Sequence, residues 1–139
     1  MISYANDIAL DRLKAFSRAI DSHASLAGKL RIYTGTMPLN GGEITTQTLL
    51  ASLEFPKPSL GDFSGRQIEL LKPLNVLASA NGLAAWGRIT SGGGDFVLDL
   101  SVGLVGSGAP LQLVTNTDPP SLDVYSGGVV SVLSIILSE

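Results

Sequence analysis

The spacing of hydrophobic residues changes once along the chain, near Gly28. Before this glycine, the apolar residues recur at intervals of four, three and four, at Ala9, Leu13, Phe16 and Ile20. These intervals place the four side chains on one face of a helix, and charged residues occupy the other face. The pattern predicts an amphipathic helix within residues 1–27, with Asn6 or Asp7 as its N-cap residue. A stripe this narrow favours docking of the helix, either on the rest of the chain or on the helix of a second subunit.

From Lys29 onward, apolar and polar residues alternate with a period of two, and Gly, Pro, Asn and Asp interrupt the alternation. This pattern predicts strands at residues 30–34, 48–55, 67–71, 74–78, 83–90, 96–102, 111–115 and 129–137. Because one open sheet would leave a face uncovered, about eight strands favour a jelly-roll-like β-sandwich. We therefore expect a mainly β fold in one domain, with the N-terminal helix in residues 1–27 and the sandwich in residues 28–139.

Composition favours a chain that works in an assembly. Of its 139 residues, 45% are hydrophobic and only 15% are charged, so much of the surface must be apolar or uncharged. Such a surface favours self-association into a symmetric dimer or trimer and contact with a larger partner. The net charge of −3 and the scattered Lys and Arg residues argue against direct nucleic-acid binding. No apolar run approaches the roughly 20 residues that span a bilayer, so we expect no membrane contact.

Residue patterns for catalysis, cofactors and metals are weak. The glycines at 91–94 and 103–108 lack the Lys-Ser or Lys-Thr pair and the helix of a phosphate loop, so we interpret both as loops between strands. His23 is the only histidine, and we expect it at the C-terminal end of the helix, where it has a structural role. There is no cysteine, and Asp118 and Asp123 do not have the spacing of a calcium loop. The sequence thus predicts no catalytic residue, cofactor or metal, and no enzymatic activity.

Trp86, the only tryptophan, admits two interpretations. In a strand it shares a face with Arg88 and Thr90, where it could anchor the core or, together with Arg88, form an interface hot spot. The prolines after Asp118 favour a stiff loop, which either connects two strands rigidly, the more common role of such prolines, or also binds a partner. The candidate interface residues are Phe16, Ile20, Leu39, Asn40, Trp86, Arg88, Asp118, Pro119 and Pro120. Contacts are expected in the segments 39–43, 91–95 and 117–121, because binding residues gather in the end loops of a rigid sandwich.

Several motifs together resemble a known family. The run Leu30-Arg31-Ile32-Tyr33-x-Gly35-Thr36-x-Pro38 is followed by strand motifs at residues 84–89, 99–103 and 127–132. In this order they resemble a family of small virion structural proteins of tailed bacteriophages. The resemblance implies a capsid cement or decoration protein that bridges copies of the major capsid protein and resides in the host cytoplasm before assembly.

Two other functions fit the same sequence. A structural protein of the neck, tail or baseplate fits the resemblance equally well. A carbohydrate-binding β domain fits the fold class, but the chain has few aromatic residues, 6% in all, from which to build a sugar platform.

Overall fold

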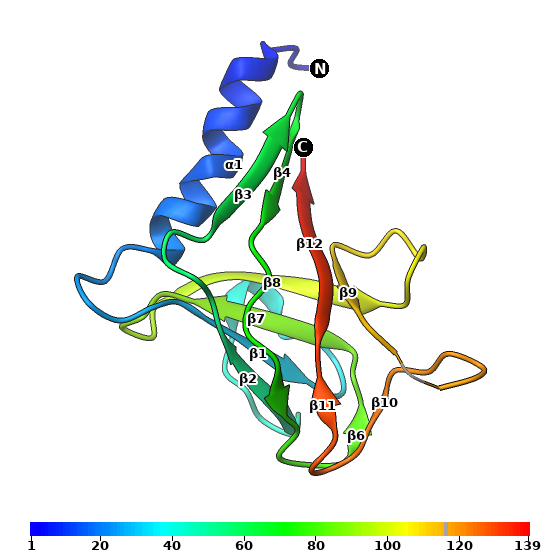
Figure 1. The fold of residues 1–139 in the computed structure, drawn as a ribbon. Helices are drawn as coiled ribbons and strands as arrows, with labels where there is room; N and C mark the ends of the chain where they lie inside the picture. The colour runs from blue at the N-terminus through cyan, green and yellow to red at the C-terminus, as the bar shows by residue number, and fades with distance from the viewer. Residues whose placement is uncertain (116) are drawn as a thin grey trace.

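The computed structural model describes residues 1–115 and 117–139 and is mainly β, with one helix at the N-terminus (Figure 1). The helix α1 spans Asn6–Ile20, and a short 3₁₀ turn, η1, spans Leu39–Gly41. The strands, in chain order, are β1 (Lys29–Tyr33), β2 (Leu49–Glu54), β3 (Leu60–Ser64), β4 (Gln67–Leu70), β5 (Val76–Leu77), β6 (Gly82–Leu83), β7 (Trp86–Thr90), β8 (Phe96–Gly103), β9 (Leu111–Leu113), β10 (Asp123–Val124), β11 (Val129–Val130) and β12 (Val132–Ser138).

Eight of these strands form one curled sheet in the order β2-β1-β7-β8-β9-β12-β4-β3. Strands β8 and β9 are parallel, and the other neighbours are antiparallel. In Figure 1, β3, β4 and β12 run across the direction of β1, β7 and β8, so the two halves of the sheet face each other like the layers of a sandwich. Two small sheets, β5 with β11 and β6 with β10, lie at the end opposite the chain termini. The expected mainly β fold with one helix is confirmed.

The core lies between the two halves of the curled sheet. Leu30 of β1, Ile89 of β7, Leu111 of β9 and Ile135 of β12 are completely buried within it. Gly87 of β7 faces the same core, and a Cβ atom there would lie 3.0 Å from the side chains of Leu111 and Leu30. A glycine at this position therefore lets the two halves approach closely.

Helix α1 packs against β3, β4 and β8, which answers the question of where it docks. Its buried positions are Ala9, Leu13, Ser17 and Ile20, whereas Phe16 is only half-buried. The predicted N-cap is wrong. Ala5 is the N-cap residue, and its methyl side chain cannot make a capping bond. Asn6 lies inside the helix, where its side-chain oxygen accepts a hydrogen bond from Arg66.

His23 does not lie on the helix, which ends at Ile20. The backbone turns at Asp21, and the N–H groups of Ser25 and Leu26 donate hydrogen bonds to Nδ1 of His23, at 3.2 and 2.9 Å. The imidazole therefore fixes a loop after the helix, a structural role in a different place from the one predicted.

The strand predictions hold in the central sheet and fail at its irregular elements. Strands β3 and β10 were not predicted. In β3, Gly61 and Asp62 lie at a bulge that breaks the period of two. Strand β10 has only two residues, too few for a period of two to be recognised. The predicted strand 83–90 divides into β6 and β7, and 129–137 divides into β11 and β12. At each division the chain passes from a small sheet into the eight-stranded sheet. The hydrophobic pattern of the sequence does not reveal this change of sheet.

Candidate functional site

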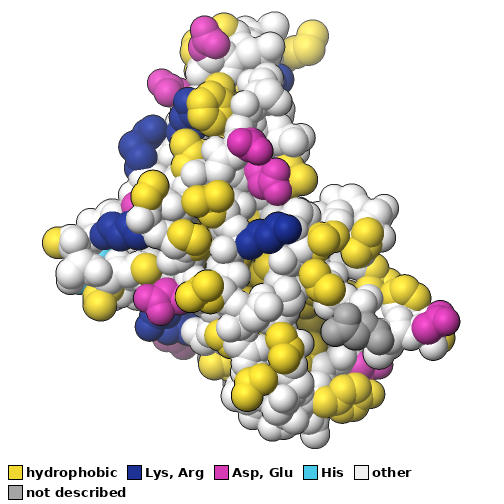
Figure 2. All heavy atoms as spheres, viewed as in Figure 1, with side chains coloured by type: hydrophobic (Ala, Val, Ile, Leu, Met, Phe, Trp, Pro, Cys, Tyr) yellow, Lys and Arg dark blue, Asp and Glu magenta, His cyan; other side chains and the backbone are white. Residues whose placement is uncertain are grey.

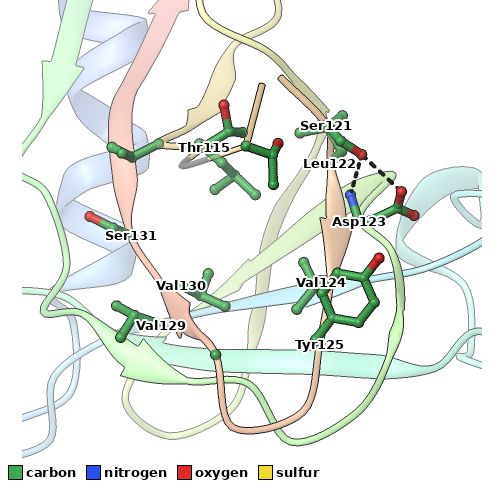
Figure 3. Close-up of a pocket in the computed structure, with 13 residues that line it drawn as sticks. Thr115, Ser121, Leu122, Asp123, Val124, Tyr125, Val129, Val130 and Ser131 are labelled. Atoms are coloured by element: carbon green, nitrogen blue, oxygen red, sulfur yellow. Dashed lines mark hydrogen bonds between the residues drawn. The ribbon is translucent and has the colours of Figure 1, made fainter. Parts of the chain in front are cut away.

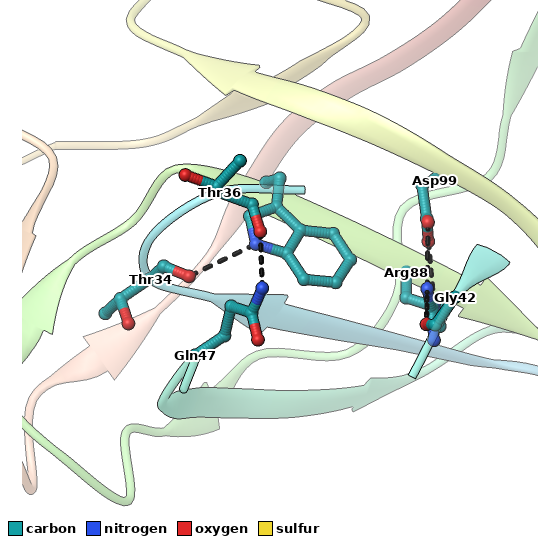
Figure 4. A network of polar contacts seen from close by, with 7 residues as sticks. Thr34, Thr36, Gly42, Gln47, Arg88 and Asp99 are labelled. Atoms are coloured by element: carbon teal, nitrogen blue, oxygen red, sulfur yellow. Dashed lines mark hydrogen bonds and ion pairs between the residues drawn. The ribbon is translucent and has the colours of Figure 1, made fainter. Parts of the chain in front are cut away.

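Trp86 is buried, with 1% of its surface exposed, on the face of β7 opposite the core that contains Leu30 and Leu111. Its ring stacks on that of Tyr33 with the centroids 4.8 Å apart, and its Nε1–H donates a hydrogen bond of 3.1 Å to the carbonyl oxygen of Thr34 (Figure 4). Gln47 closes the same loop by donating to the carbonyl oxygen of Thr36. Its own chain therefore covers Trp86, which lies under this loop and not in the main core, so the ring is not exposed as an interface residue.

Arg88 is held in a nearly buried ion pair. Its Nε and one terminal nitrogen donate to the two carboxylate oxygens of Asp99, at 2.8 and 3.0 Å, and the side chains are only 12% and 6% exposed. The same terminal nitrogen donates to the carbonyl oxygen of Gly42 at 2.9 Å. The hydrogen bond to Asp99 raises the pKa of Arg88 above its ordinary value, although burial acts in the opposite direction. Arg88 therefore fastens the segment after η1 to the sheet, and it is not free to bind a partner (Figure 4).

The other candidate interface residues lie in separate places. Ile20 is fully buried in the core, and Phe16 lines a pocket between α1 and β8. Leu39 and Asn40 are exposed in η1, where Leu39 keeps 88% of its surface accessible. Asp118, Pro119 and Pro120 are exposed in the loop between β9 and β10. The structure does not bring these residues together into one surface.

Sequence reasoning missed a group of exposed hydrophobic residues at the end of the molecule formed by β5, β6, β10 and β11. Leu77 and Val129 are direct cross-strand partners, 64% and 62% exposed. Leu83 of β6 and Tyr125 after β10 are 56% and 65% exposed, and Val114 lies beside β11 through its N–H bond to Ser131. We call Leu77, Leu83, Val114, Tyr125 and Val129 the apolar end.

A network of turn hydrogen bonds holds the apolar end in shape. Asn81 accepts a hydrogen bond of 2.7 Å from the N–H of Ser126, and the N–H of Gly127 donates to the carbonyl oxygen of Ala78. In return, the N–H of Ala78 donates to the carbonyl oxygen of Gly128. These bonds join the turn after β10 to the turn after β5, so the exposed side chains project from a braced surface.

A pocket of about 220 Å³ opens beside the apolar end (Figure 3). Val124 of β10 and Val130 of β11 line its opposite sides, and Leu113 lines it from β9. Polar groups lie on both sides of it: the Ser121 hydroxyl donates to the Asp123 carboxylate at 2.9 Å on one side, and Ser131 lies on the other. The pocket therefore combines apolar and polar lining.

Charge is scarce around this surface. The stretches 73–87, 100–117 and 124–138 contain no Asp, Glu, Lys, Arg or His, and they supply all five residues of the apolar end. Among the described residues, no Lys or Arg side chain appears on the lowest part of the face in Figure 2, where several hydrophobic side chains are exposed. These uncharged stretches are the sequence signal that could have identified the surface, since depletion of charge marks the centre of protein interfaces.

Within residues 1–115 and 117–139, no three His, Asp or Glu residues gather as metal ligands do. In the same part of the chain, no helix has the length and hydrophobicity needed to cross a bilayer.

Comparisons with known proteins give no relative for this chain. No protein-family model matches it, and neither the curated proteins nor the solved structures contain a match.

Proposed function

We propose that this chain is a structural protein of a tailed-bacteriophage virion, a capsid cement or decoration protein that works by contact and carries out no turnover chemistry. The apolar end is the observation that carries the proposal, because a braced hydrophobic surface with few charges around it is suited to permanent burial against another protein. The motif resemblance between residues 30 and 132 supports the virion setting, with the major capsid protein as the partner.

The size of the surface fits a protein that acts in many copies. Leu77, Leu83, Tyr125 and Val129 are each between 56% and 65% exposed. Full burial of such a side chain is worth about 1.5–3 kcal/mol, so covering the exposed parts contributes about 1–2 kcal/mol each. That sum, before the entropic cost of association, gives a modest contact per copy. When many copies bind the same capsid, the stabilising free energies of their individual contacts add up.

A charge introduced at the apolar end tests the proposal. Val129→Asp or Leu77→Asp places a carboxylate at the centre of the surface without touching the core. We expect either variant to fold with an unchanged circular dichroism spectrum but to bind poorly to phage heads that lack the protein. Ile8→Asp is the matched control, because Ile8 is 53% exposed in the first turns of α1, at the opposite end of the molecule. Normal binding of both apolar-end variants would refute the contact surface.

Deletion of the gene distinguishes the capsid from other parts of the particle. For a cement protein we expect heads that fill and join tails but burst at a lower temperature or under milder osmotic shock. Full, stable heads without tails would assign the protein to the neck. Densitometry of purified virions adds the copy number, because a cement protein approaches the abundance of the major capsid protein and a neck protein does not.

A further inference from the structure

The chain contains two Asn-Gly pairs, Asn40–Gly41 and Asn81–Gly82, and the structure holds them very differently. In such a pair the backbone nitrogen of glycine can attack the side-chain amide carbon of asparagine, because glycine has no Cβ to obstruct the approach. A bond forms between that nitrogen and Cγ, the bond from Cγ to Nδ2 breaks, and ammonia leaves. Solvent water then opens the five-membered imide at either carbonyl and yields aspartate or isoaspartate.

Asn40 is free to react. It is exposed in η1 beside Leu39, and its backbone adopts the left-handed conformation, with φ 52° and ψ 40°. The hydrogen bonds nearest in the sequence, from Gly42 N–H to the Leu39 carbonyl and from Arg88 to the Gly42 carbonyl, bypass its carboxamide. Opening one short turn is therefore enough to let residue 40 rotate into the geometry of attack.

Asn81 is held at both reacting groups. Its Oδ1 accepts the Ser126 N–H at 2.7 Å, which fixes the carboxamide. Gly82 lies in β6 opposite Val124, so its backbone is held in a strand, whereas Gly41 lies in a short turn. The space around the two glycines does not distinguish them, since an added Cβ would lie 2.6 Å from the Thr34 side chain at Gly82 and 2.7 Å from the Phe96 ring at Gly41. Attack at this pair requires the loss of the Asn81 bond and the release of β6 from β10.

From this contrast we propose that Asn40 is a site of spontaneous deamidation and that the fold protects Asn81. The product carries a new carboxylate next to the segment that Arg88 fastens to the sheet, and it makes the net charge of −3 more negative by one unit. The inference is independent of the proposed function, because it depends only on the local geometry of the two pairs.

Incubation of the purified protein at mildly alkaline pH, followed by tryptic digestion under acidic conditions and mass spectrometry, tests the proposal. Residues 32–66 and 67–88 form separate tryptic peptides, since trypsin does not cleave before Pro58 or Pro73, and each peptide holds one Asn-Gly pair. A hydrogen bond that must break before the attack lowers the fraction of molecules in a reactive geometry by about tenfold. We therefore expect Asn40 to convert at least about ten times faster than Asn81 in the folded protein. Anion-exchange chromatography should show the matching acidic form, and Asn40→Gln should abolish it.

The same incubation in urea is the internal control. Without the fold, both pairs have a free glycine neighbour, and their rates should become similar. Equal rates at the two sites in the folded protein would overturn the proposal. So would an unmodified Asn40 after an incubation in which the unfolded chain has converted half of it.

Discussion

The ion pair between Arg88 and Asp99 gives the sharpest test of how the sheet is held. Arg88 in β7 and Asp99 in β8 are direct cross-strand partners, and their side chains are 12% and 6% exposed. Arg88→Met keeps a long side chain over the neighbouring rings but leaves the Asp99 carboxylate without its partner. Removal of one member of a buried pair costs about 3–5 kcal/mol, because the remaining charge stays desolvated. We expect Arg88→Met to lower the free energy of unfolding by about this amount.

The double variant Arg88→Met/Asp99→Leu separates desolvation from packing. Without the carboxylate, no unpaired charge remains, so the double variant should recover about 2–3 kcal/mol relative to Arg88→Met, a coupling typical of residues in contact. Urea unfolding followed by Trp86 fluorescence measures all three free energies, since the ring of Trp86 lies 5.4 Å from the guanidinium. A loss below about 1 kcal/mol in Arg88→Met, the value of an exposed pair, would refute the role assigned to the pair.

Three further predictions follow from burial and backbone contacts. Ile20→Ala should lower the free energy of unfolding in urea by about 2–5 kcal/mol, because Ile20 is fully buried. Phe16→Ala should lower it by less, because Phe16 is only half-buried, and a larger decrease for Phe16 would show that its pocket is closed. Gly92→Ala should be strongly destabilising, because the new Cβ would lie 2.1 Å from the Leu26 carbonyl oxygen. In Gly94→Ala the Cβ meets no atom within 4 Å, and only the φ angle of 92° is unfavourable. Equal melting temperatures of the two variants would contradict this difference. The protein alone should sediment as a dimer or trimer, because so weakly charged a chain gains by covering apolar surface in a closed assembly; a 14.4 kDa monomer at tens of micromolar, a concentration on the order of a weak-interface Kd, would count against self-association.

The sequence by itself determined the class of fold and most of the central strands. The helical interval of Leu13 and Ile20 survives in the structure, as does the alternation of β4, β9 and the first four residues of β1, because each of these elements buries one face more than the other and local periodicity records that face. The hairpin at residues 91–95 was also predictable, since its glycines permit the backbone that joins β7 to β8. Charge depletion in residues 73–87 and 124–138 was equally present in the sequence.

Only the tertiary structure decided what those residues do. It buried Trp86 against Tyr33 and paired Arg88 with Asp99, because both faces of β7 are covered, one by the core and the other by the loop that contains Thr34 and Gln47. Long-range pairing likewise brought β5 to β11 and β6 to β10, and so placed exposed residues from three uncharged stretches on one end of the molecule. A hydrophobic pattern shows that a side chain prefers to be covered. Whether its own chain covers it, as with Trp86, or leaves it exposed, as with Val129, depends on contacts between residues far apart in the sequence.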